Sequence, residues 1–380
     1  MWQDLISQVI NFSSPNIFNK FKQKYSLNSA AFYPGLIGIE LRNMPGEISI
    51  NNFKIDAPVF IKDNDILMLN FQNAELLNKN SIDRTLIEHA KIAINNFIKY
   101  DTNVYKIGNK QFSFDNSYTM GIINVTPDSF SDGGVNFNPK DAINSALKMI
   151  DSGADIIDIG GESSRPGSLP VSIEEEISRV APVVKEIKKM RPEIIISVDT
   201  TKSEVAENVL ELGAEIINDI SGLMFDKKMP DVVKKFDAGI IIMHMKGTPK
   251  NMQENPEYDD VVTEVYDFLF RQVKFAKDAG INKIFIDPGI GFGKKVEHNL
   301  ELLNQLENFK SIGCPIVVGI SRKSLFKKLL GLETGERENA TSVFNAVAIQ
   351  KGARIIRTHN VEFGIQTCKL LNSLNKPFNV

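Results

Sequence analysis

Polar side chains follow a series of short apolar runs in the later part of the chain. One run, Met120–Val125, leads into a loop that carries Asp128 and Asp132, and other runs end at residues such as Asp199 and Asp287. A single Asp at the end of a strand is more often a cap for the next helix than a ligand-binding group. Several carboxylate, amide and cationic groups at one opening would instead bind a polar small molecule.

The apolar runs alternate with amphipathic segments of helical periodicity. The runs lie at 120–125, 156–159, 194–198, 215–218, 240–243, 284–286, 316–318 and 355–356. They consist mainly of Ile and Val without alternation, which is typical of parallel strands buried on both faces. Eight strand–helix units predict a (β/α)8 TIM barrel, an α/β fold whose functional residues lie at the carboxyl ends of the strands. An open doubly wound sheet is the alternative, but its glycine-rich phosphate fingerprint is missing.

The first part of the chain has a different pattern. It is rich in Asn, and its apolar residues predict strands around 36–41 and 66–69 and a helix over 82–98. We therefore predict two domains, a small α+β extension over 1–115 and the barrel over 116–380. The extension contains no recognisable catalytic motif, so we expect it to stabilise the protein or to bind a partner.

Composition narrows the class of protein further. The chain has 380 residues, of which 42% are hydrophobic and 24% charged, as in ordinary globular enzymes. A net charge of −3 offers no general attraction for nucleic acid, so an anionic ligand must meet locally placed cations. No signal-peptide pattern and no apolar run of the ~18 residues that span a bilayer are visible. We expect a cytoplasmic protein that binds neither nucleic acid nor membranes.

Residues 121–133, Gly-Ile-Ile-Asn-Val-Thr-Pro-Asp-Ser-Phe-Ser-Asp-Gly, form the most specific motif of the chain. They resemble the first strand and first loop of the dihydropteroate synthases, a family that joins a pterin to p-aminobenzoate. The resemblance extends over about residues 110–380 and includes the loop 160–167, the segment 287–294 and the run 321–324. The segment 289–294 also looks like a phosphate loop, but Pro288 and Lys295 occupy positions where that motif requires Gly and Ser or Thr.

The resemblance implies a pterin pocket beside a diphosphate site. The residues implied in pterin binding are Asp199, Asn218, Met243, Asp287 and Lys323. Carboxylates accept hydrogen bonds from the amino group and ring N–H of a pterin, while an amide both donates and accepts. Asn124, Arg357 and His359 are implied at the diphosphate, with Asn124 also a ligand of Mg²⁺, the expected cofactor.

The resemblance also implies a site for p-aminobenzoate under two mobile loops. The residues implied there are Phe130, Ser164, Arg165, Pro166, Phe292 and Ser324. Members of the family usually have Thr at the position of Ser164, so this chain keeps the hydroxyl and loses a methyl group. The resemblance further implies that the protein forms a homodimer through the later helices of the barrel and that sulfonamides target it.

The resemblance implies one reaction in particular: (7,8-dihydropterin-6-yl)methyl diphosphate and p-aminobenzoate would give 7,8-dihydropteroate and pyrophosphate. A pterin-binding methyltransferase is the alternative enzyme, but it has no use for a diphosphate clamp such as Arg357 with His359. A catalytically inactive barrel that serves as a scaffold is the alternative of another class, and it would normally have lost some of these polar residues.

Overall fold

The computed structural model describes residues 5–27, 32, 36–43, 59–62, 65–69, 84–126, 139–164 and 167–374. The chain divides into two compact units. The first consists of Met1–Tyr100 together with Gln305–Gly313, and the second of Asp101–Asn304 together with Cys314–Val380. In the described parts of the chain, no helix combines the length and the apolar character that crossing a bilayer requires.

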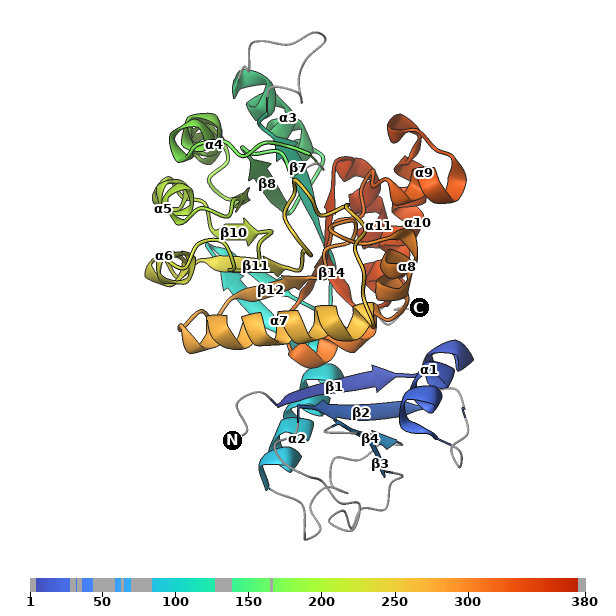
Figure 1. The fold of residues 1–380 in the computed structure, drawn as a ribbon. Coiled ribbons are helices and arrows are strands. Elements are labelled where there is room, and N and C mark those ends of the chain that lie inside the picture. The colour runs from blue at the N-terminus through green and yellow to red at the C-terminus, as the bar shows by residue number, and fades with distance from the viewer. Residues whose placement is uncertain are drawn as a thin grey trace, which may run out of the picture. The chain divides into compact units, whose positions relative to one another are not determined.

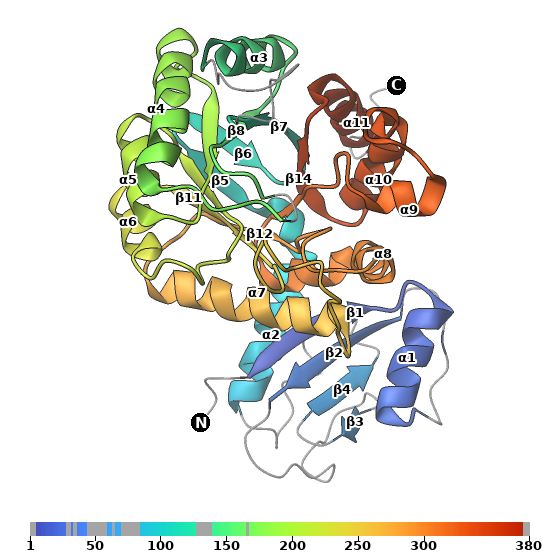
Figure 2. The ribbon, with the colours of Figure 1, turned by 45° about the horizontal axis from the view of Figure 1, so that its top comes forward.

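The second unit contains a closed barrel of parallel strands, as the sequence predicts. Its strands are β7 (Tyr118–Asn124), β8 (Ile156–Gly160), β9 (Ile195–Asp199), β10 (Ile216–Asp219), β11 (Gly239–Met243), β12 (Ile284–Asp287), β13 (Ile316–Val318) and β14 (Ala353–Thr358). They pair in the order β10-β11-β12-β13-β14-β7-β8-β9 and close the ring. Figure 2 shows the helices of this unit arranged around the strands. Closure excludes the open doubly wound sheet.

Helices surround these strands (Figure 1). They are α3 (Pro139–Asp151), α4 (Ile173–Met190), α5 (Ser203–Glu211), α6 (Met229–Lys235), α7 (Val261–Asp278), α8 (Val296–Asn304), α9 (Leu325–Leu330), the 3-10 turn η6 (Thr334–Glu336), α10 (Glu338–Gln350) and α11 (Val361–Leu374). Each lies between two barrel strands in sequence or follows the last one, so the loops at the carboxyl ends of the strands are brought to one face.

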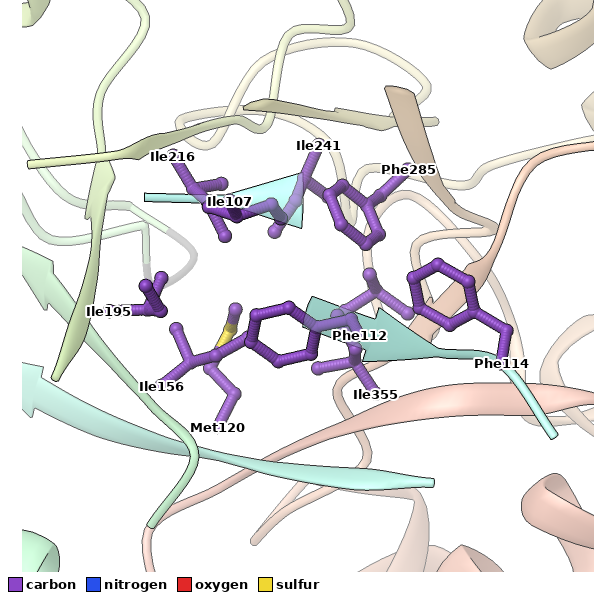
Figure 3. Close-up of a cluster of buried hydrophobic side chains, with 11 residues drawn as sticks. Ile107, Phe112, Phe114, Met120, Ile156, Ile195, Ile216, Ile241, Phe285 and Ile355 are labelled. Atoms are coloured by element: carbon purple, nitrogen blue, oxygen red, sulfur yellow. The ribbon is translucent and has the colours of Figure 1, made fainter. Parts of the chain in front are cut away.

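A hairpin that precedes the barrel completes its apolar core. The hairpin consists of β5 (Val104–Ile107) and β6 (Lys110–Ser113). Two side chains of the hairpin and one that follows it pack with one side chain from every barrel strand (Figure 3). This core cluster comprises Ile107, Phe112, Phe114, Met120, Ile156, Ile195, Ile216, Ile241, Phe285, Val317 and Ile355. The hairpin is therefore part of the barrel unit.

The division into compact units differs from the predicted domain boundary at residue 115. The compact barrel unit begins at Asp101, before the hairpin. The physical reason is that Phe112 and Phe114 have no exposed surface and fill the barrel interior rather than an N-terminal core. Arg354 on β14 further holds this segment, because its Nε donates to the carbonyl oxygen of Phe114 at 2.6 Å.

The first unit is built on an antiparallel sheet. Its strands β1 (Ile6–Asn11), β2 (Ile37–Arg42), β4 (Asp65–Leu69) and β3 (Val59–Lys62) pair in that order. Two helices, α1 (Pro15–Tyr25) and α2 (Arg84–Ile98), and a short 3-10 helix η3 (Tyr100–Thr102) at the boundary accompany the sheet in sequence. The predicted strands at 36–41 and 66–69 and the predicted helix over 82–98 correspond to β2, β4 and α2.

A segment from the later part of the chain also belongs to the first unit. This 3-10 helix, η5 (Leu306–Ile312), follows α8 in sequence and contacts β1 and α2. The Val9 N–H donates to the Ser311 hydroxyl at 3.3 Å. The Asn96 side-chain amide donates to the Ser311 carbonyl oxygen at 3.1 Å. Leu306, Phe309 and Ile312 are buried. The chain thus enters and leaves the first unit again long after the sheet is complete.

We predict that a protein beginning at Asp101 melts at a lower temperature than the full chain and aggregates more readily. Deletion removes β1 and α2, which cover η5, and burying each of Leu306, Phe309 and Ile312 is worth ~1.5–3 kcal/mol. Differential scanning calorimetry and light scattering measure both effects. A truncated protein in which these three residues are replaced by Gln should aggregate less, whereas a plain truncation as stable and monodisperse as the full chain would contradict the prediction.

Candidate active site

The barrel interior changes from apolar to polar toward the carboxyl ends of its strands. Side chains two residues apart point to the same face of a strand. Two residues beyond the core cluster stand Ile122, Asp158, Ser197, Asn218, Met243, Asp287, Gly319 and Arg357. Four of the predicted site residues lie in this layer. Because they come from four different strands, only the folded structure shows that they lie at the same level. The layer also contains Asp158 and Ser197, which the sequence analysis missed.

The guanidinium of Arg357 bridges two carboxylates inside the barrel. Its Nε donates to Asp158 Oδ2 at 2.6 Å, and its Nη2 donates to Asp199 Oδ2 at 3.0 Å. Burial opposes the charge of Arg357, but Asp158 and Asp199 outweigh burial and raise its pKa. Burial in turn raises the pKa of Asp199 to about 7, although Arg357 acts in the opposite direction. The structure therefore joins a residue predicted for the diphosphate with one predicted for the pterin.

Two buried oxygen atoms beside this bridge lack a hydrogen-bond partner among the described residues. They are Asp158 Oδ1 and Ser197 Oγ. The second oxygen of Asp158 is satisfied by Arg357 and by the amide of Asn218 at 3.2 Å. Because an unsatisfied buried polar atom costs free energy, such atoms indicate where a ligand supplies hydrogen bonds. One sequence signal could have revealed Asp158, which is the only acidic residue of Ile156–Gly160.

Asp287 and Lys323 contribute opposite charges to the same interior. Burial raises the pKa of Asp287 to about 6, against the effects of the Gly289 N–H and of Lys323 and Arg357. Burial lowers the pKa of Lys323 to about 8, as does Arg357, while Asp287 and Asp199 oppose this. The Lys323 ammonium lies 4.0 Å from the ring centroid of Phe292, a distance typical of a cation–π interaction.

The backbone immediately before Lys323 is held in an uncommon conformation. Arg322 has a φ of +57°, in the left-handed region. Its Nε donates to Glu338 Oε1 at 2.6 Å, and Arg337 donates to its carbonyl oxygen at 2.8 Å. Both partners belong to the start of α10, so this helix fixes the turn from which Lys323 extends. The adjacent cations Arg322 and Lys323 thus have separate roles, one structural and one in the site.

An apolar surface lies beside the polar groups. Met243 packs in one buried cluster with Ile220, Met252 and Phe292. Both Met243 and Phe292 are predicted site residues. Met243 is the last residue of β11, and Phe292 lies in the loop after β12. Apolar side chains next to convergent carboxylates suit a flat heterocycle, because its faces are apolar and its edge carries donors and acceptors.

The predicted diphosphate residues other than Arg357 lie at the outer end of the barrel. Asn124 is the last residue of β7 and pairs in register with Gly160, which in turn pairs with Asp199. His359 follows β14, and its Nδ1 lies 3.0 Å from the hydroxyl of Ser321. The same hydroxyl accepts the His359 N–H at 3.2 Å. Ser321 therefore orients the imidazole through two contacts.

At one strand end the Asp has a structural role in the turn that follows, although it caps no helix. Asp219 accepts hydrogen bonds from the N–H and the hydroxyl of Ser221, at 2.8 and 2.6 Å, and from the Leu223 N–H at 2.9 Å. Its carboxylate organises the turn after β10 and is not available to a ligand. The neighbouring Asn218 is the residue of that strand that faces the site.

The predicted p-aminobenzoate residues are only partly described. Ser164 is partly exposed after β8, and Ser324 is exposed at the start of α9, where its side chain caps no N–H. Phe130, Arg165 and Pro166 lie outside the described residues. Of the predicted set, Phe292 is the one whose contacts with the polar interior are seen directly.

Comparison with known proteins agrees with this geometry. A family model described as pterin binding enzyme matches residues 120–359. The dihydropteroate synthase of Escherichia coli (strain K12) is 44% identical over 258 residues, which cover 67% of this chain and 91% of that protein. The enzyme of Clostridium beijerinckii is 46% identical over 261 residues, which cover 67% of this chain and 94% of that protein.

Solved structures match the same part of the chain. The Yersinia pestis dihydropteroate synthase with a sulfonamide drug complex has a TM-score of 0.67 and 38% identity, covering 72% of this chain and 98% of that one. The Xanthomonas albilineans enzyme with 4-aminobenzoic acid has a TM-score of 0.68 and 35% identity, covering 73% and 99%. By the family match and by these relatives, the chain belongs to the dihydropteroate synthase family of pterin-binding enzymes.

Proposed function

We propose that this chain condenses (7,8-dihydropterin-6-yl)methyl diphosphate with p-aminobenzoate, giving 7,8-dihydropteroate and pyrophosphate. The observation that carries the proposal is the polar layer of the barrel, where Asp158 Oδ1 and Ser197 Oγ are buried without partners among the described residues. A pterin edge offers the amino and ring N–H donors that these oxygens and the carboxylates of Asp199 and Asp287 accept. Membership of the synthase family supports the same reaction.

The pterin would lie between the carboxylates and the apolar cluster. Asn218 already donates to Asp158, so its amide oxygen remains for a ligand N–H. Met243 would pack on a ring face, Phe292 would lie beside it on the side of the p-aminobenzoate, and Lys323 would donate to a ring oxygen or nitrogen. These contacts come from different strands, so the ring is held in one orientation with its exocyclic methylene toward the outer end of the barrel.

The reaction needs stabilisation of the leaving group more than an activated nucleophile. The C–O bond to the diphosphate breaks and its electron pair leaves with the pyrophosphate, while the pterin ring delocalises the positive charge at the methylene. The arylamine nitrogen then forms the new C–N bond and loses a proton. Arg357, His359 and Asn124 stand where they would bind the departing charge, and preorganised groups of this kind lower the barrier.

A magnesium ion on the diphosphate fits the donor set. Among the described residues no three His, Cys, Asp or Glu side chains gather as a metal site. Mg²⁺ commonly takes one or two protein ligands together with substrate phosphates and water, so the amide oxygen of Asn124 suffices on the protein side. When bound, the ion would neutralise part of the phosphate charge.

The p-aminobenzoate would occupy the mouth above the methylene. Ser324 is exposed at the start of α9 and Ser164 is partly exposed after β8, so both hydroxyls would be within reach of a carboxylate at the mouth. For Phe130, Arg165 and Pro166 the assignment rests on the family resemblance. Closure of these loops would exclude water, which competes with the arylamine for the cation.

A second copy of the chain is the proposed partner. Exposed apolar side chains occur on neighbouring helices at one-turn spacing, Val343 with Val347 on α10 and Leu370 with Leu374 on α11. Residues four apart share a helix face. Two such faces in contact would suit the apolar core of a homodimer interface.

We predict that Asp199→Asn and Lys323→Ala each lower turnover by ~100-fold or more, because each removes a charge from the site. Dihydropteroate formation from the pterin diphosphate, p-aminobenzoate and Mg²⁺ measures this and tests the proposed function itself. Burial raises the pKa of Asp199 from 3.8 to about 7, so stability falls as the pH rises between these two values. Turnover is therefore compared at pH 8, where Asp199 is charged and the Asn variant should melt no lower. The exposed Asp237→Asn is the control. Near-normal turnover in both site variants would contradict the pocket assignment.

We predict that p-aminobenzoate binds at least ~10-fold more tightly when pyrophosphate, Mg²⁺ and a pterin analogue are present, a positive coupling between sites. Pyrophosphate on Asn124, Arg357 and His359 would order the loops that complete the arylamine site. Isothermal titration with and without these ligands gives the two affinities, with sulfate replacing pyrophosphate as the control. Equal affinities would show that the arylamine site is preformed.

We predict that Val343→Glu combined with Leu370→Glu converts a dimer into monomers, because both charges would be buried in the interface. Sedimentation velocity measures the change in mass. Ile92→Glu changes an exposed apolar residue on α2 and should leave the mass unaltered. A monomeric parent protein, or a double variant that remains dimeric, would show that this face is not the interface.

A further inference from the structure

Lys294 is a buried lysine that the reaction as described does not use. It lies in the loop after β12, and 3% of its surface is exposed. Its Nζ lies 2.9 Å from His244 Nδ1 and 3.0 Å from the carbonyl oxygens of Gly289 and Phe292. The His244 carbonyl oxygen is 3.2 Å away. Among the described residues no carboxylate forms an ion pair with it, so its direct contacts are with carbonyl oxygens and an imidazole nitrogen.

These contacts fasten the loop after β12 to the end of β11. Gly289 has a φ of +68°, and a Cβ there would stand 1.9 Å from the carbonyl oxygen of His244. Gly293 has a φ of +61°, and a Cβ there would stand 2.4 Å from the carbonyl oxygen of Lys246. The two backbones are therefore in direct contact, and three carbonyl oxygens point at one ammonium. Without it, the carbonyl oxygens of His244 and Phe292 would lose this donor, and that of Gly289 would keep the Phe292 N–H at 3.0 Å.

The residues that Lys294 binds are the same ones that shape the pterin site. The Gly289 N–H donates to Asp287 Oδ1 at 2.7 Å and fixes that carboxylate. The ring of Phe292 lies 4.0 Å from the ammonium of Lys323 and belongs to the apolar cluster with Met243. A loop held in this position thus orients an acceptor, a donor and an apolar face at once.

We propose that Lys294 is a positioning residue for pterin recognition, which holds Gly289 and Phe292 where they orient Asp287 and Lys323. The inference rests on the proposed function, because it assigns Asp287 and Lys323 to the pterin. It differs from a purely structural role in one respect. Lys294 also contributes a positive charge near Asp287, so its removal should change how pterin binding depends on pH.

The charges around Asp287 fix the direction of that change. Burial raises its pKa, and Gly289, Lys323, Arg357 and Lys294 lower it. Arg357 is shared with Asp158 and Asp199, and burial together with Lys294 lowers the pKa of His244, which is therefore neutral. Burial lowers the pKa of Lys294 to about 7; Asp287 raises it, and Lys323 and Lys246 lower it. Removing Lys294 should therefore raise the pKa of Asp287 and extend its protonated range upward.

The experiment measures the affinity for pteroic acid between pH 5 and 8 by isothermal titration in the full chain. Lys294→Met should bind roughly ten-fold more weakly at pH 7. The fall in affinity on the acid side should begin about one pH unit higher than in the parent. Lys294→Gln keeps two N–H donors but removes the charge, so it should show the pH shift with a smaller loss of affinity. Lys283→Met removes a lysine just before the opposite end of β12 and should change neither.

Each outcome bears on one assignment. A parent protein that binds no pteroic acid would refute the proposed function. If the parent binds pteroic acid and both variants lose affinity at the same acidic pH as the parent, the role of Lys294 is refuted. Circular dichroism and melting curves accompany each variant. If Lys294→Met does not fold, Lys294→Gln decides. If neither variant gives the cooperative transition of the parent, Lys294 is a requirement of the fold, and the positioning role is wrong.

Discussion

The pairing of Arg357 with Asp158 and Asp199 is the interaction on which the rest of the site depends. A guanidinium inside a barrel is costly unless carboxylates meet it with good geometry. Here the two carboxylates come from neighbouring strands, and Arg357 comes from β14. Burial moves the pKa of Asp199 toward 7, against the effect of Arg357. Burial also moves the pKa of Lys323 toward 8, and here Arg357 acts in the same direction.

The apolar layer beneath this bridge gives it a firm base. Every barrel strand contributes one side chain to the core cluster, and the hairpin of β5 and β6 adds Ile107, Phe112 and Phe114 (Figure 3). Close packing at this level leaves the strands little freedom, so the next inward side chains stand at defined positions. The polar layer can then keep unsatisfied atoms, such as Asp158 Oδ1 and Ser197 Oγ, without losing its shape. The apolar and polar layers are thus separated along the barrel axis.

The first unit is not a simple N-terminal extension, because it also contains a segment from the later part of the chain. The segment η5 leaves the barrel after α8, contacts β1 and α2 of the first unit and returns to β13. Leu306, Phe309 and Ile312 are buried residues of the first unit, although they lie within the barrel's part of the chain. The N-terminal part of the first unit, Met1–Tyr100, lies outside the region that the family model matches, and its sheet is an addition to the common barrel.

Local pattern by itself determined the barrel and much of its mouth. Unbroken Ile and Val runs specify buried parallel strands, and polar residues at strand ends such as Asp199, Asn218 and Asp287 are visible because a strand end is a local feature. Tertiary structure alone decided the rest. Asp158 is selected by the alternation of side chains in a closed ring, Ser321 by its contacts with His359, and Lys294 by three carbonyl oxygens from two segments. The hairpin and η5 were assigned to their units only by the cores they enter, because an apolar residue shows that it will be buried but not against which partner.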